Sequence, residues 1–118
     1  MNTAPPSGAA ERRRLAREAR DAFPPMGVYA VRDHGTGLVR VGASRDVHAR
    51  LRRLQFELRL GGCPDKELQA AWRQDPARLS FEVLDLVRQR SDPAFDYAEE
   101  LRVLEQLHRH ELCAGAAP

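Results

Sequence analysis

Arginine is the residue type in this sequence whose clustering most directly suggests chemistry. Eighteen of the 19 basic residues are arginines, and Lys66 is the one lysine. The planar guanidinium group binds phosphate through paired hydrogen bonds, although a GC-rich genome produces the same bias in composition. The densest group predicts a sequence-independent contact with a nucleic-acid backbone. It consists of Arg45, Arg50, Arg52, Arg53 and Arg59.

Arg50 differs from its neighbours because it borders an apolar stripe. The apolar residues recur at helical spacing, so Arg50 is expected at the margin of a buried helix face, where a long side chain reaches over the edge of a sheet. That position suits phosphate binding. The alternative is a solvated arginine paired with a carboxylate of the same helix. The apolar stripe that Arg50 borders consists of Val47, Leu51, Leu54 and Leu58.

Tyr29 and Glu105 are the other candidate reactive side chains. Tyr29 lies in a β-prone run, and its phenol can act as a base only if nearby charge stabilises the phenolate, because its ordinary pKa is about 10. Arg50 is the expected source of that charge. Glu105 borders a second helical stripe, so it is placed to face a cleft as a hard oxygen ligand for magnesium or manganese. The alternatives are a half-buried strand tyrosine and an exposed glutamate paired with Arg102 or Arg109.

Residues of the types that bind zinc lie near the end of the sequence. His108, His110 and Cys113, with Cys63 as a fourth, are suitable ligands by type. Positions 108 and 110 of a helix point about 200° apart, so both bind one ion only if the helix ends between them. The spacing therefore argues against a zinc site.

Composition indicates one folded domain. The 118 residues are 42% hydrophobic and 31% charged, close to the average for globular proteins. Basic residues (19) nearly balance acidic ones (17), so the net charge of +2 does not by itself identify a nucleic-acid-binding protein. No apolar run resembles a signal peptide or a membrane span, so we expect a cytoplasmic protein without a membrane partner, with free thiols at Cys63 and Cys113.

The chain divides into a compact domain and its flanks. Residues 26–112 carry the periodic apolar patterns, and the division rests on where these begin and end. We expect a disordered tail over residues 1–10, a basic helix and linker over 11–25, the domain over 26–112, and a frayed tail over 113–118.

Within the domain, local patterns predict a small sheet flanked by helices. Strands are expected over residues 27–32, 38–41 and 79–87. Gly42 to Ser44 are expected to end the second strand, with Ser44 capping the helix that follows. Gly61 and Gly62 are expected to end that helix, and Pro64 to begin the next. The last helix is expected over 96–110, with Tyr97, Leu101, Leu104 and Leu107 buried. The fold class is thus α/β, of the α+β type, with a three-stranded, mainly antiparallel sheet.

Short motifs in order along the chain resemble those of the GIY-YIG nuclease superfamily. Gly27-Val28-Tyr29 opens the first strand like the GIY tripeptide, and Arg40-Val41-Gly42 matches YIG in its last two residues. The segment after Gly42 resembles the family's helix start and puts Arg50 at the arginine position. The likeness then continues through Gly61-Gly62-Cys63, Leu68-Gln69 with Trp72, Phe81 to Leu84, and Leu104-Glu105. The sequence is most similar to a variant subgroup of small stand-alone bacterial proteins and of domains attached to helix-turn-helix regulators.

The resemblance implies a metal-dependent endonuclease that hydrolyses DNA phosphodiesters. In family members a glutamate on a late helix holds a single divalent metal ion, and a tyrosine activates the attacking water. These roles fall on Glu105, with Mg²⁺ or Mn²⁺, and on Tyr29. Arg50 and Arg40 complete the expected catalytic set as phosphate contacts. Nucleic acid, DNA in particular, is the expected partner.

Three positions depart from the family pattern. Arg40 replaces the aromatic hydroxyl of the second tripeptide and cannot relay a proton at neutral pH. Leu54 and Cys63 stand where histidines are common. Two functions therefore stay open: an endonuclease with a variant, weakened site, and a catalytically inactive module that binds nucleic acid or regulates through a protein partner. Arg40 beside Arg50 favours retained phosphate binding.

Overall fold

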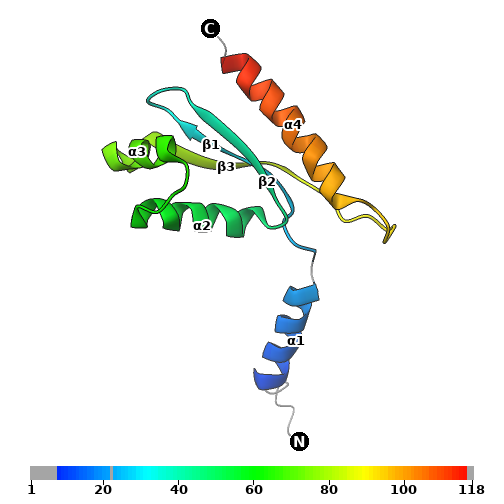
Figure 1. The fold of residues 1–118 in the computed structure, drawn as a ribbon. Coiled ribbons are helices and arrows are strands. Elements are labelled where there is room, and N and C mark those ends of the chain that lie inside the picture. Colours follow the sequence, from blue (N-terminus) through cyan, green and yellow to red (C-terminus); the bar gives the residue numbers. More distant parts are fainter. Residues whose placement is uncertain (1–7, 22, 117–118) are drawn as a thin grey trace, which may run out of the picture.

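A three-stranded antiparallel sheet forms the centre of the computed structural model, which describes residues 8–21 and 23–116 (Figure 1). Strand β1 (Gly27–Asp33) lies between β2 (Val39–Ser44) and β3 (Leu79–Leu86). It is central because its apolar residues alternate between two covered faces. Val28 and Ala30 on one face, and Tyr29 and Val31 on the other, are all buried. The predicted α+β fold class is confirmed.

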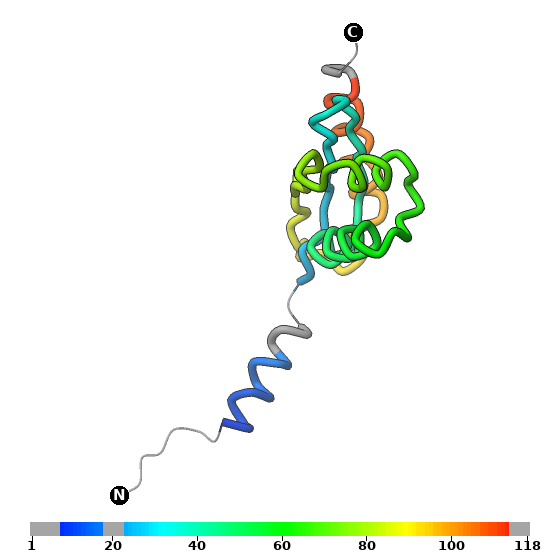
Figure 2. The backbone as a smooth tube through the Cα atoms, turned by 90° about the vertical axis from the view of Figure 1, so that its left-hand side faces the viewer, coloured from blue at the N-terminus to red at the C-terminus, as the bar shows by residue number. Residues whose placement is uncertain are grey.

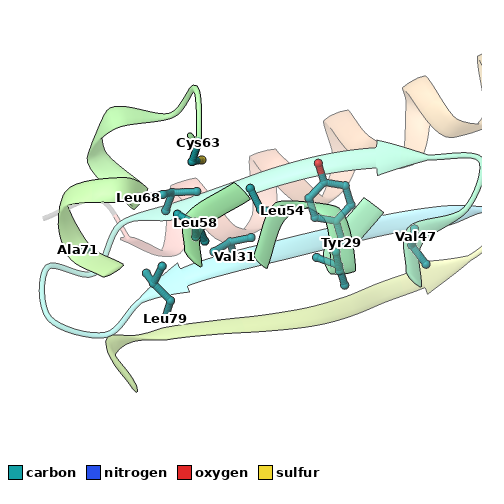
Figure 3. Packing of buried hydrophobic residues seen from close by; sticks show 10 residues of the cluster. Tyr29, Val31, Val47, Leu54, Leu58, Cys63, Leu68, Ala71 and Leu79 are labelled. Atoms are coloured by element: carbon teal, nitrogen blue, oxygen red, sulfur yellow. The ribbon is translucent and has the colours of Figure 1, made fainter. Parts of the chain in front are cut away.

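Helices cover both faces of the sheet (Figure 1). Helices α2 (Val47–Leu60) and α3 (Lys66–Gln74), followed by the 3₁₀ turn η1 (Pro76–Arg78), pack on the face that carries Tyr29 and Val31. The predicted apolar stripe of α2 is buried there, as Figure 3 shows for three of its four residues. Helix α4 (Tyr97–Ala116) covers the opposite face, where Leu101 packs with Met26 and Val87.

The basic N-terminal helix α1 (Gly8–Asp21) stands apart from the sheet (Figure 2). It begins earlier than the expected Glu11, because Ala9 and Ala10 favour helix and extend it toward the N-terminus. The rest of the expected tail, residues 1–7, lies outside the described residues. None of the helices in the described ranges is long and apolar enough to cross a membrane.

The expected break of the second strand at Gly42 is wrong. Strand β2 continues to Ser44, and Gly42 pairs with Tyr29 inside the ladder. The cap of α2 is also two residues later than expected: the side chain of Asp46 accepts a hydrogen bond from the Ala49 amide, at 3.0 Å. Ser44 instead hydrogen-bonds the Asp46 backbone. Local glycine content predicted a break because it does not reveal the cross-strand partner.

Helix α2 ends as predicted at Gly61, whose φ of 79° is left-handed and suits glycine. Pro64, however, precedes α3 rather than starting it. Asp65 is the cap of α3, because its side chain accepts from the amides of Glu67 and Leu68. The carboxylate of Asp65 therefore already has one structural role before any function is considered.

Helix α4 is longer than expected and its buried line differs. It runs to Ala116 and so includes Cys113, while residues 117–118 lie outside the described part. Leu107 is exposed rather than buried. At 3.6 residues per turn, position 108 continues the line of Leu101 and Leu104. His108 occupies that place and contacts Asp85 of β3, with 3.2 Å between Nε2 and Oδ2.

Candidate functional site

A pocket of about 170 Å³ on the α2 and α3 side of the sheet collects three of the four residues predicted to be catalytic. Tyr29 comes from the central strand, Arg40 from β2 and Arg50 from α2. Leu54, Cys63 and Asp65 are also among its lining residues. Glu105 is not. The topology thus joins positions that are scattered along the sequence into one concave surface.

The two tripeptide motifs meet through the Tyr29 ring. Tyr29 pairs with Gly42 in the ladder, so their side-chain positions lie on the same face. A Cβ atom on Gly42 would lie only 2.4 Å from the hydroxyl oxygen and 2.5 Å from Cζ of Tyr29. The ring therefore occupies the space that any other residue at position 42 would fill. In Figure 3 the Tyr29 side chain extends from β1 toward β2.

Gly27, the glycine of the first tripeptide, is needed for a different close approach. A Cβ there would lie 2.0 Å from the carbonyl oxygen of Asp85 on β3. The ladder between β1 and β3 shifts register between Val28 and Tyr29, and this bulge lies next to Gly27. Glycine at position 27 therefore lets β3 lie against β1 at the point where Tyr29 is set in place.

Arg50 contacts Tyr29 directly. Its Nε atom lies 3.3 Å from the phenol oxygen and donates a hydrogen bond to it. This hydrogen bond raises the pKa of Arg50 despite partial burial. Arg50 is therefore cationic at neutral pH, with the phenol oxygen of Tyr29 as its hydrogen-bond partner. The predicted helix-margin position of Arg50 is what allows its side chain to reach the sheet.

Arg40 has anionic partners instead. Its Nε donates to Oδ2 of Asp65 at 2.8 Å, and its Nη2 lies 3.2 Å from Oε1 of Glu67. The hydrogen bond to Asp65 raises the pKa of Arg40. Burial acts to raise the pKa of Asp65, but hydrogen bonds from Arg40 and from the Leu68 amide outweigh it and lower that pKa. The sequence alone did not indicate Asp65 and Glu67 as partners of Arg40. The only local signal was the helix-cap pattern at Asp65.

The wall of the pocket is apolar where the resemblance led us to look for histidines. Leu54 and Cys63 are 6% and 8% exposed. Burial raises the pKa of the Cys63 thiol, so at neutral pH it is protonated and supplies no base. The buried Gln69 side chain holds the segment in place by accepting from the Cys63 amide and donating to the Leu58 carbonyl. Neither wall position supplies an imidazole for proton transfer.

Glu105 lies on α4, across the sheet from the pocket. Its carboxylate accepts a hydrogen bond from Nη2 of Arg109, and the same Nη2 donates to the carbonyl oxygen of Val41 at 2.8 Å. Val41 belongs to β2 and lines the pocket. Arg109 thus connects Glu105 to the strand that separates it from the other candidate residues. The pairing with Arg109 was one of the alternatives that the sequence left open.

Metal ligands do not cluster in the described part of the chain. Within residues 8–21 and 23–116, no group of three or more histidine, cysteine, aspartate or glutamate side chains could hold an ion. Cys63 is buried under α2 and α3, whereas His108 contacts Asp85 on the α4 side. The four residues considered for zinc therefore form no site. Cys63 and Cys113 are both free thiols.

The arginines of the predicted nucleic-acid contact differ in whether they have an ion-pair partner. Arg53 contacts Glu57 at 3.0 Å, one turn along the helix. Arg45, Arg52 and Arg59 are exposed, and no ion pair within the described residues engages them. These three guanidinium groups therefore keep their full positive charge in solvent. They are the members of the predicted nucleic-acid contact that remain available to an external anion.

Two solved structures share this fold. The chain is 17% identical to the catalytic domain of the homing endonuclease I-TevI, with a TM-score of 0.59, over 75% of this chain and 88% of that one. A variant of that domain in which one glutamate is replaced by alanine matches with the same identity and TM-score, over 75% of this chain and 84% of the variant. No protein-family model and no curated protein matches the sequence. The expected GIY-YIG nuclease-like arrangement of strands and helices is confirmed at the level of the fold.

Proposed function

We propose that this chain is a GIY-YIG-type DNA endonuclease domain with a variant active site, which hydrolyses phosphodiesters in the presence of magnesium or manganese. The observation that carries the proposal is the hydrogen bond between Arg50 and Tyr29 in a pocket of a nuclease-like fold. A cation beside a hydroxyl is a suitable pair for holding a phosphate and a water molecule together.

Arg50 and Tyr29 have complementary roles in this proposal. Arg50 binds a non-bridging oxygen of the scissile phosphate and offsets charge that develops there. The phenol oxygen of Tyr29, which accepts from Arg50, has a proton and a further lone pair with which to orient the attacking water. Gly42 supports both roles, because it leaves room for the Tyr29 ring at the required place.

Glu105 is the proposed metal ligand. One carboxylate suits Mg²⁺, which commonly keeps several waters and takes its other ligands from substrate phosphate. Such an ion would supply a Lewis acid that neutralises phosphate charge. The Glu105 side chain is 28% exposed, so an ion can reach it from solvent. Its hydrogen bond with Arg109 must then be exchanged for the ion, which makes metal binding weaker than at an unpaired carboxylate.

A second function, DNA binding without hydrolysis, is favoured by the state of Arg40. This residue replaces a tyrosine of the motif, and both of its partners are carboxylates. Its charge is offset within the protein, so it adds less to phosphate binding than Arg50 does. Leu54 and Cys63 also remove two proton-transfer groups. A site that retains only the Arg50 and Tyr29 pair is suited to recognition even if catalysis is lost.

Cleavage and binding assays distinguish the two functions. The purified chain is incubated with supercoiled plasmid and with labelled branched or single-stranded DNA, with manganese or magnesium. Glu105→Gln and Arg50→Ala are the test variants, and Arg102→Ala, an exposed arginine of α4, is the matched control. Endonuclease function predicts metal-dependent nicking that both test variants lose and the control retains. Salt-sensitive binding without nicking, unchanged by Glu105→Gln, supports the binding module and rejects hydrolysis.

A further inference from the structure

A second concave surface lies where α2 ends and α3 packs beside it. This groove has a volume of about 500 Å³ and shares no lining residue with the candidate site. Arg59 and Leu60 reach it from the end of α2, and Trp72 and Arg73 from α3. Figure 2 views the molecule from this side, with α2 and α3 on the same face of the sheet. The candidate pocket does not include this surface, although Arg59 also belongs to the predicted nucleic-acid contact.

The charged residues that line the groove are all cationic. They are Arg59 and Arg73, and no carboxylate is among the lining residues. The candidate site differs, because Asp65 lines it and offsets Arg40. Neither Arg59 nor Arg73 has an ion-pair partner among the described side chains. The groove is therefore a place where an anion meets two guanidinium groups that have no carboxylate partner among the described residues.

Helix dipoles explain part of this arrangement but not all of it. Arg59 and Arg73 each lie in the last turn of their helix, where a cation offsets the negative end of the dipole. That end carries about half an elementary charge, whereas each guanidinium carries a full one. About half an elementary positive charge therefore remains at each of the two arginines that line the groove. Helix stabilisation alone does not explain why Trp72 lines the same groove.

Aromatic and apolar surface accompanies these charges. Trp72 packs against the core with part of its side chain and lines the groove with another part. Leu60 is 70% exposed. One turn earlier on α2, Phe56 is 54% exposed, with Arg52 and Arg59 at helical neighbour positions. An exposed Phe56 and a partly buried Trp72, each with arginines nearby, are typical of surfaces that stack on unpaired bases while cations follow the backbone.

We propose that the groove, continued along α2 to Phe56, binds single-stranded DNA. Trp72 and Phe56 stack on bases, and Arg59 and Arg73 contact phosphates. Single strands are favoured over duplex because their bases are free to stack on a side chain, whereas duplex bases already stack on each other. The inference deepens the proposed function, on which it rests for DNA as the partner, by adding a place for an unpaired strand outside the candidate site.

Fluorescence gives a direct test, because Trp72 is the one tryptophan of the chain and its emission reports on the groove. The full chain is titrated with oligo(dT) in EDTA, which prevents metal-dependent cleavage, while anisotropy of a labelled oligonucleotide measures binding. We expect saturable quenching that weakens with salt. Arg59→Ala combined with Arg73→Ala should weaken binding roughly tenfold or more, and Phe56→Ala roughly tenfold. Arg102→Ala should behave as wild type.

Several results would overturn the inference. These are oligo(dT) binding that leaves Trp72 emission unchanged, wild-type affinity in the double variant, an absence of oligo(dT) binding, and equal or tighter binding of blunt duplex of the same length. Arg50→Ala separates this inference from the proposed nuclease, because it should remove nicking and leave quenching intact. Quenching without nicking in the wild type supports the groove and rejects the nuclease. Nicking without quenching supports the nuclease and rejects the groove as a binding site.

Discussion

The two arginines of the candidate pocket come from different elements and have different electrostatic surroundings. Arg50, on the α2 wall, donates to the phenol oxygen of Tyr29. Arg40, on the β2 wall, contacts the carboxylates of Asp65 and Glu67. Both remain cationic, yet the charge of Arg50 is available to a ligand and that of Arg40 is largely offset. The same residue type therefore has two functions, which its partner decides.

The difference shows how the protein accommodates an arginine at position 40. An uncompensated arginine at position 40 would add a second cation to a pocket that already holds Arg50, and like charges repel. Asp65 and Glu67 remove that conflict, and Asp65 does so from a position fixed by its capping of α3. The arrangement links the α2–α3 connection to β2. We infer that Arg40 mainly holds this wall of the pocket together.

The largest expected effect is that of Arg50→Ala on cleavage. Loss of this donor should lower the nicking rate by roughly 10²–10³-fold, the usual cost of removing one donor that stabilises a transition state. Arg40→Ala should lower it by less than about tenfold, because its charge is already offset. Single-turnover rates on plasmid DNA measure both. Equal losses of nicking rate in the two variants would contradict the proposed difference between Arg50 and Arg40.

Gly42→Ala should displace the Tyr29 ring and so disturb its contact with Arg50. The added methyl group occupies the place of the Tyr29 hydroxyl, so the ring must move and lose its hydrogen bond with Arg50. We expect the free energy of unfolding to fall by about 1–3 kcal/mol and nicking to be lost. Gly62→Ala is the matched control, because no atom lies within 4 Å of its added Cβ. Urea denaturation of both variants tests this, and an unchanged Gly42→Ala would refute the packing argument.

A buried ion pair between Asp33 and Arg78, away from the candidate pocket, can be compared with the pair between Arg40 and Asp65. The hydrogen bond from Arg78, at 2.8 Å to Oδ2, is the main cause that lowers the pKa of Asp33 to about 2. A carboxylate with a depressed folded-state pKa stabilises the fold above its unfolded pKa of about 4 and loses that contribution as pH falls toward about 2. Chemical denaturation at a series of pH values should show this loss in wild type and a smaller one in Asp33→Asn. If the free energy of unfolding changes with pH in the same way in both proteins, Asp33 does not make this contribution.

Asp65→Asn should have the smallest effect and should act in the opposite direction. Asparagine still caps α3, whereas Arg40 loses the charge of its principal partner. We expect DNA affinity at low salt to rise about threefold and the slope of log affinity against log salt to steepen by up to about 0.9, the value for one further phosphate contact. Anisotropy titrations at several salt concentrations measure both. Unchanged slope and affinity would show that Arg40 cannot reach DNA even when released.

The elements of the fold follow from short-range patterns, and the sequence was informative there. Alternation of apolar residues placed β1, helical spacing placed the stripe of α2, and Gly61 ended that helix as predicted. The position of Arg50 beside the stripe was also readable, since it depends on helix geometry alone. Each of these features is set by interactions within about one or two turns of chain.

Contacts between residues far apart in the sequence determine the features of the fold that the sequence alone did not predict. Gly42 looked like a strand break because its partner, Tyr29, lies on another strand. Leu107 looked buried, although His108 continues the line that faces the sheet. In both cases the local composition was compatible with two outcomes, and the neighbouring element decided between them.

By itself, the sequence determined the α+β class, the order of the elements and the positions of Tyr29 and Arg50, because backbone propensity and apolar periodicity act locally. Only the tertiary structure decided the partners: Asp65 for Arg40, at a separation of 25 residues, and Arg109 with Val41 for Glu105 on the far side of the sheet. The physical reason is that the charge a guanidinium or carboxylate presents depends on which groups lie within a few ångströms, and packing of the sheet between its helices sets those distances.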